Sequence, residues 1–233
     1  AVNRMRSAFM YSRKELVKGQ MKIFALQLGI LLLVAFVGCS GSADKVAALK
    51  VQAEAGDVLA QYNLGHIYLE GDGVAKDSSE GAKWFLMAAE NGDVDAQYYI
   101  ALLYDDGDGV EQDDTEAVKW YSIAAKQGDQ YSQYNLAVMY DEGTGVEKDP
   151  VKAMHWFLQA AEQGDVDGQY NLGTMYENGE VGRVDLVQAY VWFSLAAKNG
   201  VPEAKDKVAN IQKQLSEEDF AKASSRSEEL QQQ

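Results

Sequence analysis

The stretch "AEAGDVLAQYNLGHIYLEGDGVAKDSSEGAKWFLMAA", residues 53–89, sets the pattern for most of the chain. When the sequence is shifted by 36 residues, this pattern returns three more times, and all four tryptophans coincide. Self-similarity at a fixed period is typical of repeat proteins, in which each unit buries the apolar face of its neighbour. The coinciding positions include Gly56, Gly92, Gly128, Gly164 and Gly200; Gln61, Gln97, Gln133 and Gln169; Tyr62, Tyr98, Tyr134 and Tyr170; and Trp84, Trp120, Trp156 and Trp192.

The first half of each unit is predicted to be a helix. In the first unit Asp57 can cap a helix that carries Ala60, Leu64 and Tyr68 on one stripe. Gly71 follows this helix, where a left-handed C-terminal cap favours glycine.

The second half of each unit is predicted to be a second helix that begins after an aspartate, Asp77 in the first unit. In "DSSE" Glu80 completes a capping box, and "DDTE" with Glu116 and "DLVQ" with Gln188 repeat it. The third unit has "DPVK" instead, with Pro150 at the first helical position, where its missing N–H costs nothing. We therefore interpret these aspartates as helix caps.

The tryptophans and their neighbours are expected to form the core. Trp84, Phe85, Ala88 and Ala89 share the second helix of the first unit, and similar residues recur in the other units. Small alanines allow close approach of helices, and the aromatic side chains fill the space between stacked pairs. Since one helix pair cannot bury its apolar face alone, core packing is the expected role of these aromatic residues.

The motif resembles the Sel1-like repeat, a relative of the tetratricopeptide repeat with a longer loop between its helices. The resemblance covers about residues 53–199. It implies an all-α protein, a right-handed α-solenoid of stacked antiparallel helix pairs, with four 36-residue repeats plus helical caps. The fourth unit departs from the motif, because its loop "ENGEVGRVD" has Val181 where the others have glycine. We expect that turn to differ in shape.

The ends of the chain are expected to cap the stack and, at the N-terminus, to direct export. Ser216 in "SEED" is expected to cap the last helix. The predicted organisation is upstream residues 1–20, which fit no signal; a signal peptide, 21–38; a lipidated linker, 39–43; an N-terminal capping helix, 44–55; the four repeats, 56–199; and C-terminal capping helices, 200–233.

The only cysteine, Cys39, lies at the end of an apolar run. Residues 21–38 begin with Met-Lys, continue with apolar residues and end in glycine, which is the outline of a secretory signal. The run is shorter than the roughly 20 residues that cross a bilayer. "FVGC" followed by "SGS" resembles the lipobox of bacterial lipoproteins, which implies lipid on Cys39 and, with Ser40 next, sorting to the outer membrane, facing the periplasm. An ordinary cleaved signal, giving a secreted or soluble periplasmic protein, or an uncleaved anchor is the alternative.

The charge of the chain argues against nucleic acid as a partner. It has 21 Lys and Arg against 36 Asp and Glu, and without residues 1–38 the balance is 15 against 35, a net charge of −20. Such a surface repels phosphate backbones and anionic lipid head groups. Contact with a membrane is therefore expected through the lipid anchor only.

Few residues suggest catalysis or metal binding. The two histidines, His66 and His155, belong to different faces of different units, and no nucleophile or phosphate-loop motif is present. The acidic loop 105–114 does not fit an EF-hand. When Asp106 is counted as position 1 of the loop, position 5, which must supply an oxygen ligand, is Val110. We expect no catalytic residues, no cofactor and no metal.

The positions that vary between units predict a binding surface. On each first helix, they lie opposite the stripe of core residues, and in tetratricopeptide-like stacks the first helices line the concave side. Aromatic residues among polar neighbours are typical interface anchors. The predicted partner-binding groove comprises Leu59, Asn63 and His66; Asp95, Tyr99 and Leu102; Tyr131, Asn135 and Val138; and Asp167, Asn171 and Thr174.

The sequence therefore predicts a non-enzymatic protein–protein interaction scaffold or adaptor, tethered to the membrane in the bacterial cell envelope and holding a protein or peptide partner there. The resemblance leaves one alternative open, an envelope enzyme or a penicillin-binding activity of the kind reported for cysteine-rich Sel1-like proteins. Those proteins carry paired cysteines in each repeat, which this chain lacks.

Overall fold

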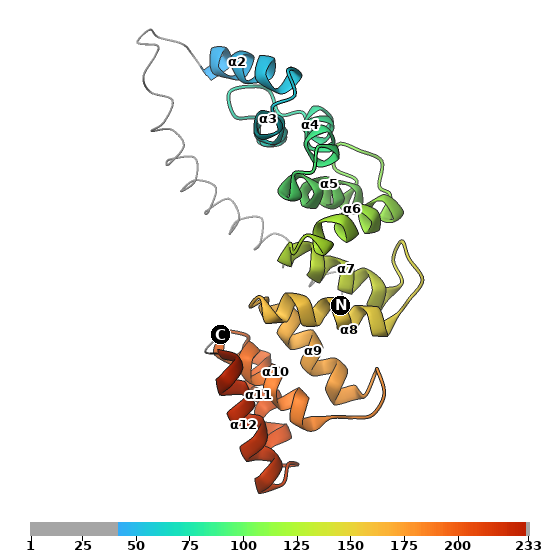
Figure 1. Ribbon diagram of the computed structural model, residues 1–233, viewed down its shortest axis with the longest axis vertical. Coiled ribbons are helices and arrows are strands. Elements are labelled where there is room, and N and C mark those ends of the chain that lie inside the picture. The colour runs from blue at the N-terminus through green and yellow to red at the C-terminus, as the bar shows by residue number, and fades with distance from the viewer. Residues whose placement is uncertain (1–41, 232–233) are drawn as a thin grey trace. The chain divides into compact units, whose positions relative to one another are not determined.

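A computed structural model describes residues 42–231 of the chain, and this part contains helices and no strands. Cys39, the signal peptide and the upstream residues lie outside the described residues. The helices, labelled in Figure 1, are α2 Ser42–Glu54, α3 Val58–Glu70, α4 Ser78–Glu90, α5 Val94–Asp106, α6 Asp114–Lys126, α7 Gln130–Glu142, α8 Pro150–Glu162, α9 Val166–Asn178, α10 Leu186–Lys198, α11 Pro202–Gln212 and α12 Glu217–Gln231.

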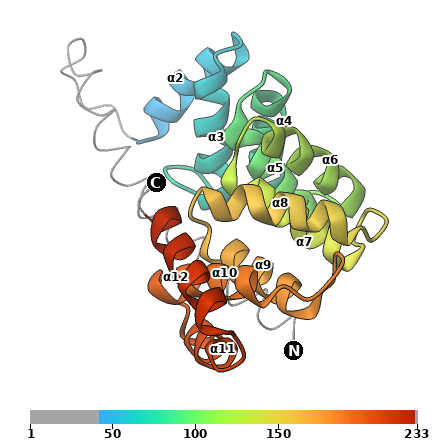
Figure 2. The same cartoon turned by 60° about the horizontal axis from the view of Figure 1, so that its bottom comes forward.

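The helices of the described part form a stack of pairs. The first helices α3, α5, α7 and α9 each pack against the second helix that follows them, and each of α4, α6 and α8 also packs against the next first helix. Successive pairs follow one another along a curved path (Figure 1). α2 covers the first pair, while α11 and α12 cover α10 at the other end (Figure 2). The predicted helical solenoid is confirmed.

The aspartate caps form as predicted, but the capping boxes do not. The carboxylate of Asp77 accepts a hydrogen bond from the Glu80 amide at 3.0 Å, and each of the other second helices begins in the same way. The Asp77 amide, however, donates to the carbonyl of Tyr68 at 2.8 Å. Because that amide is already bonded, the Glu80 carboxylate accepts from the Trp84 indole and the Lys83 ammonium instead. The predicted second bond of the box, in which the cap's amide donates to the Glu80 carboxylate, is therefore wrong.

The loops between paired helices depend on glycine in the middle units and differ in the fourth. Gly109 has φ +80°, and a Cβ there would lie 2.2 Å from the Ser78 carbonyl oxygen of the preceding unit. A Cβ at Gly145 would lie equally close to the Asp114 carbonyl oxygen. In the fourth loop the equivalent residue, Val181, does not have positive φ; Gly182 has it instead, and nothing lies within 4 Å of its Cβ position. The expected difference in the fourth turn is confirmed.

The aromatic residues of the second helices form the core, as predicted. Phe85, Tyr121 and Phe193 are fully buried, and Trp120 is 7% exposed. The exception is Trp156 of the third unit, which is half-buried. Alanines pack between these rings; the fully buried ones include Ala88, Ala124, Ala160 and Ala196.

The repeated glutamines form a chain of hydrogen bonds that we call the amide ladder. Gln97 donates from Nε2 to the carbonyl of Ala89 in the preceding unit at 3.2 Å. Its Oε1 accepts from the Gln127 side chain, at the end of its own unit's second helix, at 2.6 Å. One side chain therefore joins three helices. The ladder comprises Gln61 with Asn91, Gln97 with Gln127, Gln133 with Gln163, and Gln169 with Asn199.

Candidate partner-binding face

The four first helices, α3, α5, α7 and α9, present a surface that we call the first-helix face. Most of the predicted groove residues contribute to it. Leu59 is 52% exposed, although it is a large apolar side chain, and Asp95 is also exposed. The half-buried members are Asn63, His66, Tyr131, Asn135, Val138, Asp167, Asn171 and Thr174.

Two predicted groove residues are buried, and the expectation that they are exposed is wrong. Tyr99 is 9% exposed and Leu102 is 7% exposed. The ring of Tyr99 stacks on Phe85 of the preceding unit, with 5.1 Å between centroids and 10° between planes. It also meets the edge of His66 at 4.4 Å. Tyr99 therefore seals the junction between the first two units, so replacing it would lower stability as well as alter the surface.

His66 lies in an aromatic box formed by Tyr62, Phe85 and Tyr99, with centroid distances of 4.4 to 4.9 Å. Its Nε2 is buried and has no hydrogen-bond partner among the described residues. Burial lowers the pKa of His66 to about 4, because the charged imidazolium loses its hydration there. The histidine is consequently neutral at pH 7.

We expect His66 to make the protein less stable in mild acid. A group whose pKa falls on folding binds more protons in the unfolded state, so stability is present above the unfolded value and is lost as pH falls toward the folded value of about 4. Between pH 7.5 and pH 5 the loss should be about 1 to 2 kcal/mol. Urea unfolding at both pH values measures it.

The variant His66→Leu, which installs the residue found at position 102 of the next unit, should remove this part of the pH dependence. A variant that loses stability between the two pH values as much as the parent does would show that His66 is not the cause.

The first-helix face is acidic because its helices contain no basic residue. α3, α5, α7 and α9 together hold no Lys or Arg, but eight Asp and Glu within their bounds. The second helices α4, α6, α8 and α10 hold five Lys against five Asp and Glu. The first helices also contain ten of the chain's 13 tyrosines. Charge is therefore separated between the two layers of the stack.

The start of α5 is the part of this face with the clearest electrostatic signature. Although Asp95 reaches solvent, the pKa of its carboxyl is raised, first by loss of hydration where neighbouring groups partly enclose it and then by the nearby carboxylates of Asp93 and Asp129. The pKa of the Tyr62 hydroxyl is also raised, by burial and then by Asp95 and Asp93. Burial is the larger cause of both shifts, and the neighbouring carboxylates add to it, so negative charge is concentrated at this end of the face.

Residues 42–231 contain no group of side chains suited to hold a metal ion. Within that range no three His, Cys, Asp or Glu side chains are grouped so that they could hold a metal ion. None of the helices described there is long and apolar enough to cross a membrane.

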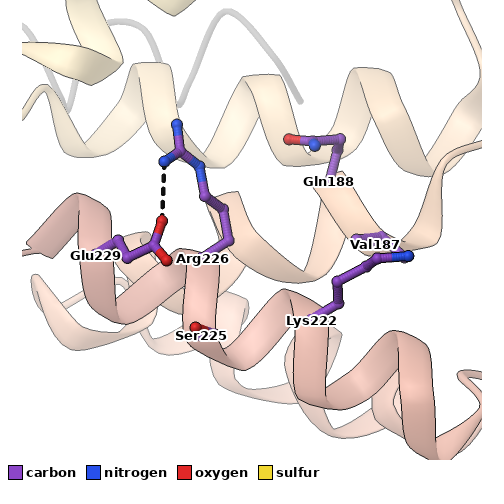
Figure 3. Close-up of a pocket in the computed structure, with 6 residues that line it drawn as sticks. All are labelled: Val187, Gln188, Lys222, Ser225, Arg226 and Glu229. Atoms are coloured by element: carbon purple, nitrogen blue, oxygen red, sulfur yellow. Dashed lines mark hydrogen bonds and ion pairs between the residues drawn. The ribbon is translucent and has the colours of Figure 1, made fainter.

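An open depression lies between α10 and α12, with a volume of about 450 Å³ (Figure 3). It is lined by Val187, Gln188, Lys222, Ser225, Arg226 and Glu229, and Arg226 is ion-paired with Glu229 at 3.1 Å. A shallow surface with one compensated ion pair offers few converging groups for a ligand.

One cation on this side of the stack was not predicted from the sequence. Lys207 of α11 forms an ion pair with Glu177 at the end of α9, and its Nζ lies 5.6 Å from the centre of the Phe193 ring. The signal was available, because a further shift of 36 residues aligns Lys207 with Asn171.

Comparison with known families identifies the repeat. Four consecutive segments, 58–93, 94–129, 130–165 and 166–201, match the Sel1 repeat. They cover more than half of the chain. No protein among those with curated functions gives a significant match.

Solved structures with the same architecture include a Sel1 repeat protein from Oxalobacter formigenes, with a TM-score of 0.65 and 29% sequence identity over 72% of this chain and 74% of that one. A protective antigen of uropathogenic Escherichia coli strains, described as displaying an SLR fold, gives a TM-score of 0.51 and 31% identity over 78% of this chain. The chain spans about half of that antigen, 47% of its length.

Proposed function

Because the chain belongs to the Sel1 repeat family, whose members are generally protein-interaction scaffolds, we propose that it is a non-enzymatic adaptor that holds a polypeptide partner on the first-helix face. The observation that carries the proposal is the first-helix face itself. Its variable positions leave side chains such as Leu59 and Asp95 exposed, while the residues kept in every unit form the core and the amide ladder. Surfaces of this kind, with apolar and aromatic groups among polar ones, are typical of binding sites.

Site-specific photo-crosslinking in cells tests which side of the stack meets the partner. A photoreactive residue at Leu59 or Asn135, on first helices, is expected to capture a defined protein. The matched controls are Met87 and Val151, which are exposed on second helices at 39% and 63%. Capture from the two second-helix positions and not from the first-helix positions would refute the assignment of the face.

We further propose that the adaptor is anchored in the bacterial outer membrane by lipid on Cys39, facing the periplasm. This part of the proposal is supported by the sequence of residues 21–41 alone. Mass spectrometry of the protein purified from cells should find a mature chain that begins at acylated Cys39. The variant Cys39→Ser should leave the membrane fraction. A mature chain that retains residues 21–38, or one with an unmodified thiol, would rule out the lipid anchor.

A further inference from the structure

The chain itself shows how one repeat junction accommodates a cation. Lys207, at the start of the C-terminal cap, reaches back to Glu177 in the last turn of α9 and lies over the ring of Phe193. Both side chains are partly buried, with 35% and 24% of their surface exposed. The ammonium therefore has a carboxylate partner and an aromatic face, two features that favour binding of lysine.

The repeat places an equivalent set of positions at every junction. A shift of 36 residues takes Lys207 to Asn171, Asn135 and Tyr99, and takes Glu177 to Asp141, Asp105 and Leu69. At the first junction the two positions are Tyr99 and Leu69, which carry no charge, and the ring of Tyr99 stacks on Phe85. At the last junction it is an ion pair. The two middle junctions keep the acid and have a short, uncharged asparagine where the last junction has lysine.

The acids at the middle junctions are in an unfavourable environment. Asp105 and Asp141 lie in the last turns of α5 and α7, beside the negative ends of the helix dipoles. Burial raises the pKa of Asp141, and Glu180 adds to the effect. Lys148 opposes it only in part, since its Nζ lies 3.8 Å from the carboxylate and is mostly exposed. A cationic side chain beside Asp141 would therefore stabilise its carboxylate, and Asp105 holds the equivalent position one unit earlier.

Building on the proposed function, we propose that the partner presents an extended lysine- or arginine-rich segment to the first-helix face, and that Asp105 and Asp141 accept its cationic side chains as Glu177 accepts Lys207. Charge complementarity supports this partner, because the first helices hold eight Asp and Glu and neither Lys nor Arg. Within the protein a lysine already lies over a tyrosine of a first helix, since the Nζ of Lys152 is 5.0 Å from the centre of the Tyr140 ring.

Fluorescence anisotropy with three labelled peptides of about twelve residues tests the proposal. The peptides alternate glycine with lysine, glutamine or glutamate. The lysine peptide is expected to bind at least tenfold more tightly than the glutamine peptide, and its affinity should fall as NaCl rises from about 50 to about 500 mM. Equal binding of the lysine and glutamine peptides would overturn the proposal in favour of an uncharged partner.

Matched variants separate the junctions from the overall charge of the protein. Asp105→Asn with Asp141→Asn should weaken binding of the lysine peptide at least tenfold. Glu90→Gln with Glu162→Gln removes the same charge from the ends of second helices and should change affinity less than twofold. If both pairs weaken binding equally, the peptide responds only to net charge, and the proposal is wrong.

A gain of lysine gives the complementary test. Asn135→Lys with Asn171→Lys gives the two middle junctions the lysine that the last junction has. The new lysines should occupy the acids, so the affinity for the lysine peptide should fall at least tenfold while the melting temperature is not lowered. Unchanged affinity would overturn the proposal. Should Asn135 crosslink a partner in cells while the lysine peptide fails to bind, the adaptor function stands and only the cationic partner is refuted.

Discussion

Replacing Trp120 with alanine is expected to lower the free energy of unfolding by about 3 to 5 kcal/mol. The indole is 7% exposed and lies in α6, which packs against both α5 and α7. Its removal leaves a cavity that helices held on two sides cannot close. Urea unfolding followed by circular dichroism measures the loss. A change below about 1 kcal/mol would mean that this side chain is not part of the core.

Conservative variants separate the packing of the indoles from their hydrogen bonds. The Nε1 of Trp84 donates to the Glu80 carboxylate at 3.1 Å, whereas the Nε1 of Trp120 is buried without a partner among the described residues. Trp84→Phe should therefore cost about 1 kcal/mol more than Trp120→Phe. As a second comparison, Trp156→Ala should cost less than Trp120→Ala, because Trp156 is only half-buried.

Replacing Gln133 with alanine is expected to cost about 2 to 4 kcal/mol. Its side chain is 4% exposed, donates to the Ala125 carbonyl at 3.2 Å and accepts from Gln163 at 2.7 Å. Each lost hydrogen bond is worth about 1 kcal/mol, and the missing side chain leaves a cavity between three helices. Chemical denaturation at pH 7.5 gives the value.

Gln133→Met keeps most of the volume, so it should recover the cavity part of the loss and retain the hydrogen-bond part. Gln130→Met, one turn earlier on α7 at a half-buried position, is the matched control and should change stability by less than about 0.5 kcal/mol. If Gln133→Met is as stable as the parent protein, the amide ladder contributes packing only.

The helices and their boundaries could be predicted from the sequence because they depend on interactions between residues close together in the chain. A helix cap depends on one side chain and the first turn beside it, so aspartates such as Asp57 and Asp77 could be assigned from their spacing alone. Gly71 likewise adopts the left-handed conformation expected of a C-terminal cap, with φ +77°. The same caps recur in four units, which strengthened the prediction. The recurrence of the tryptophans at one position of the unit also indicated that they belong to the core.

The surface of the first helices was less predictable, because burial there depends on the neighbouring unit. Helical spacing placed Tyr99 and Leu102 opposite their own core stripe, and both are nevertheless buried. A side chain that points away from its own unit meets the preceding unit when it is long enough, as Tyr99 meets Phe85, while the shorter Asn135 and Asn171 stay half-buried.

The sequence by itself determined the repeat, its helix pairs, its caps and its acidic character, since each follows from composition or from contacts within a few residues. Only the tertiary structure decided which capping bonds form, which side chains of the first helices reach solvent, and that Lys207 pairs with Glu177 thirty positions away. The physical reason is competition between partners. An amide, a ring or an ammonium binds whichever group the stacked units bring closest, and that choice depends on two repeats at once.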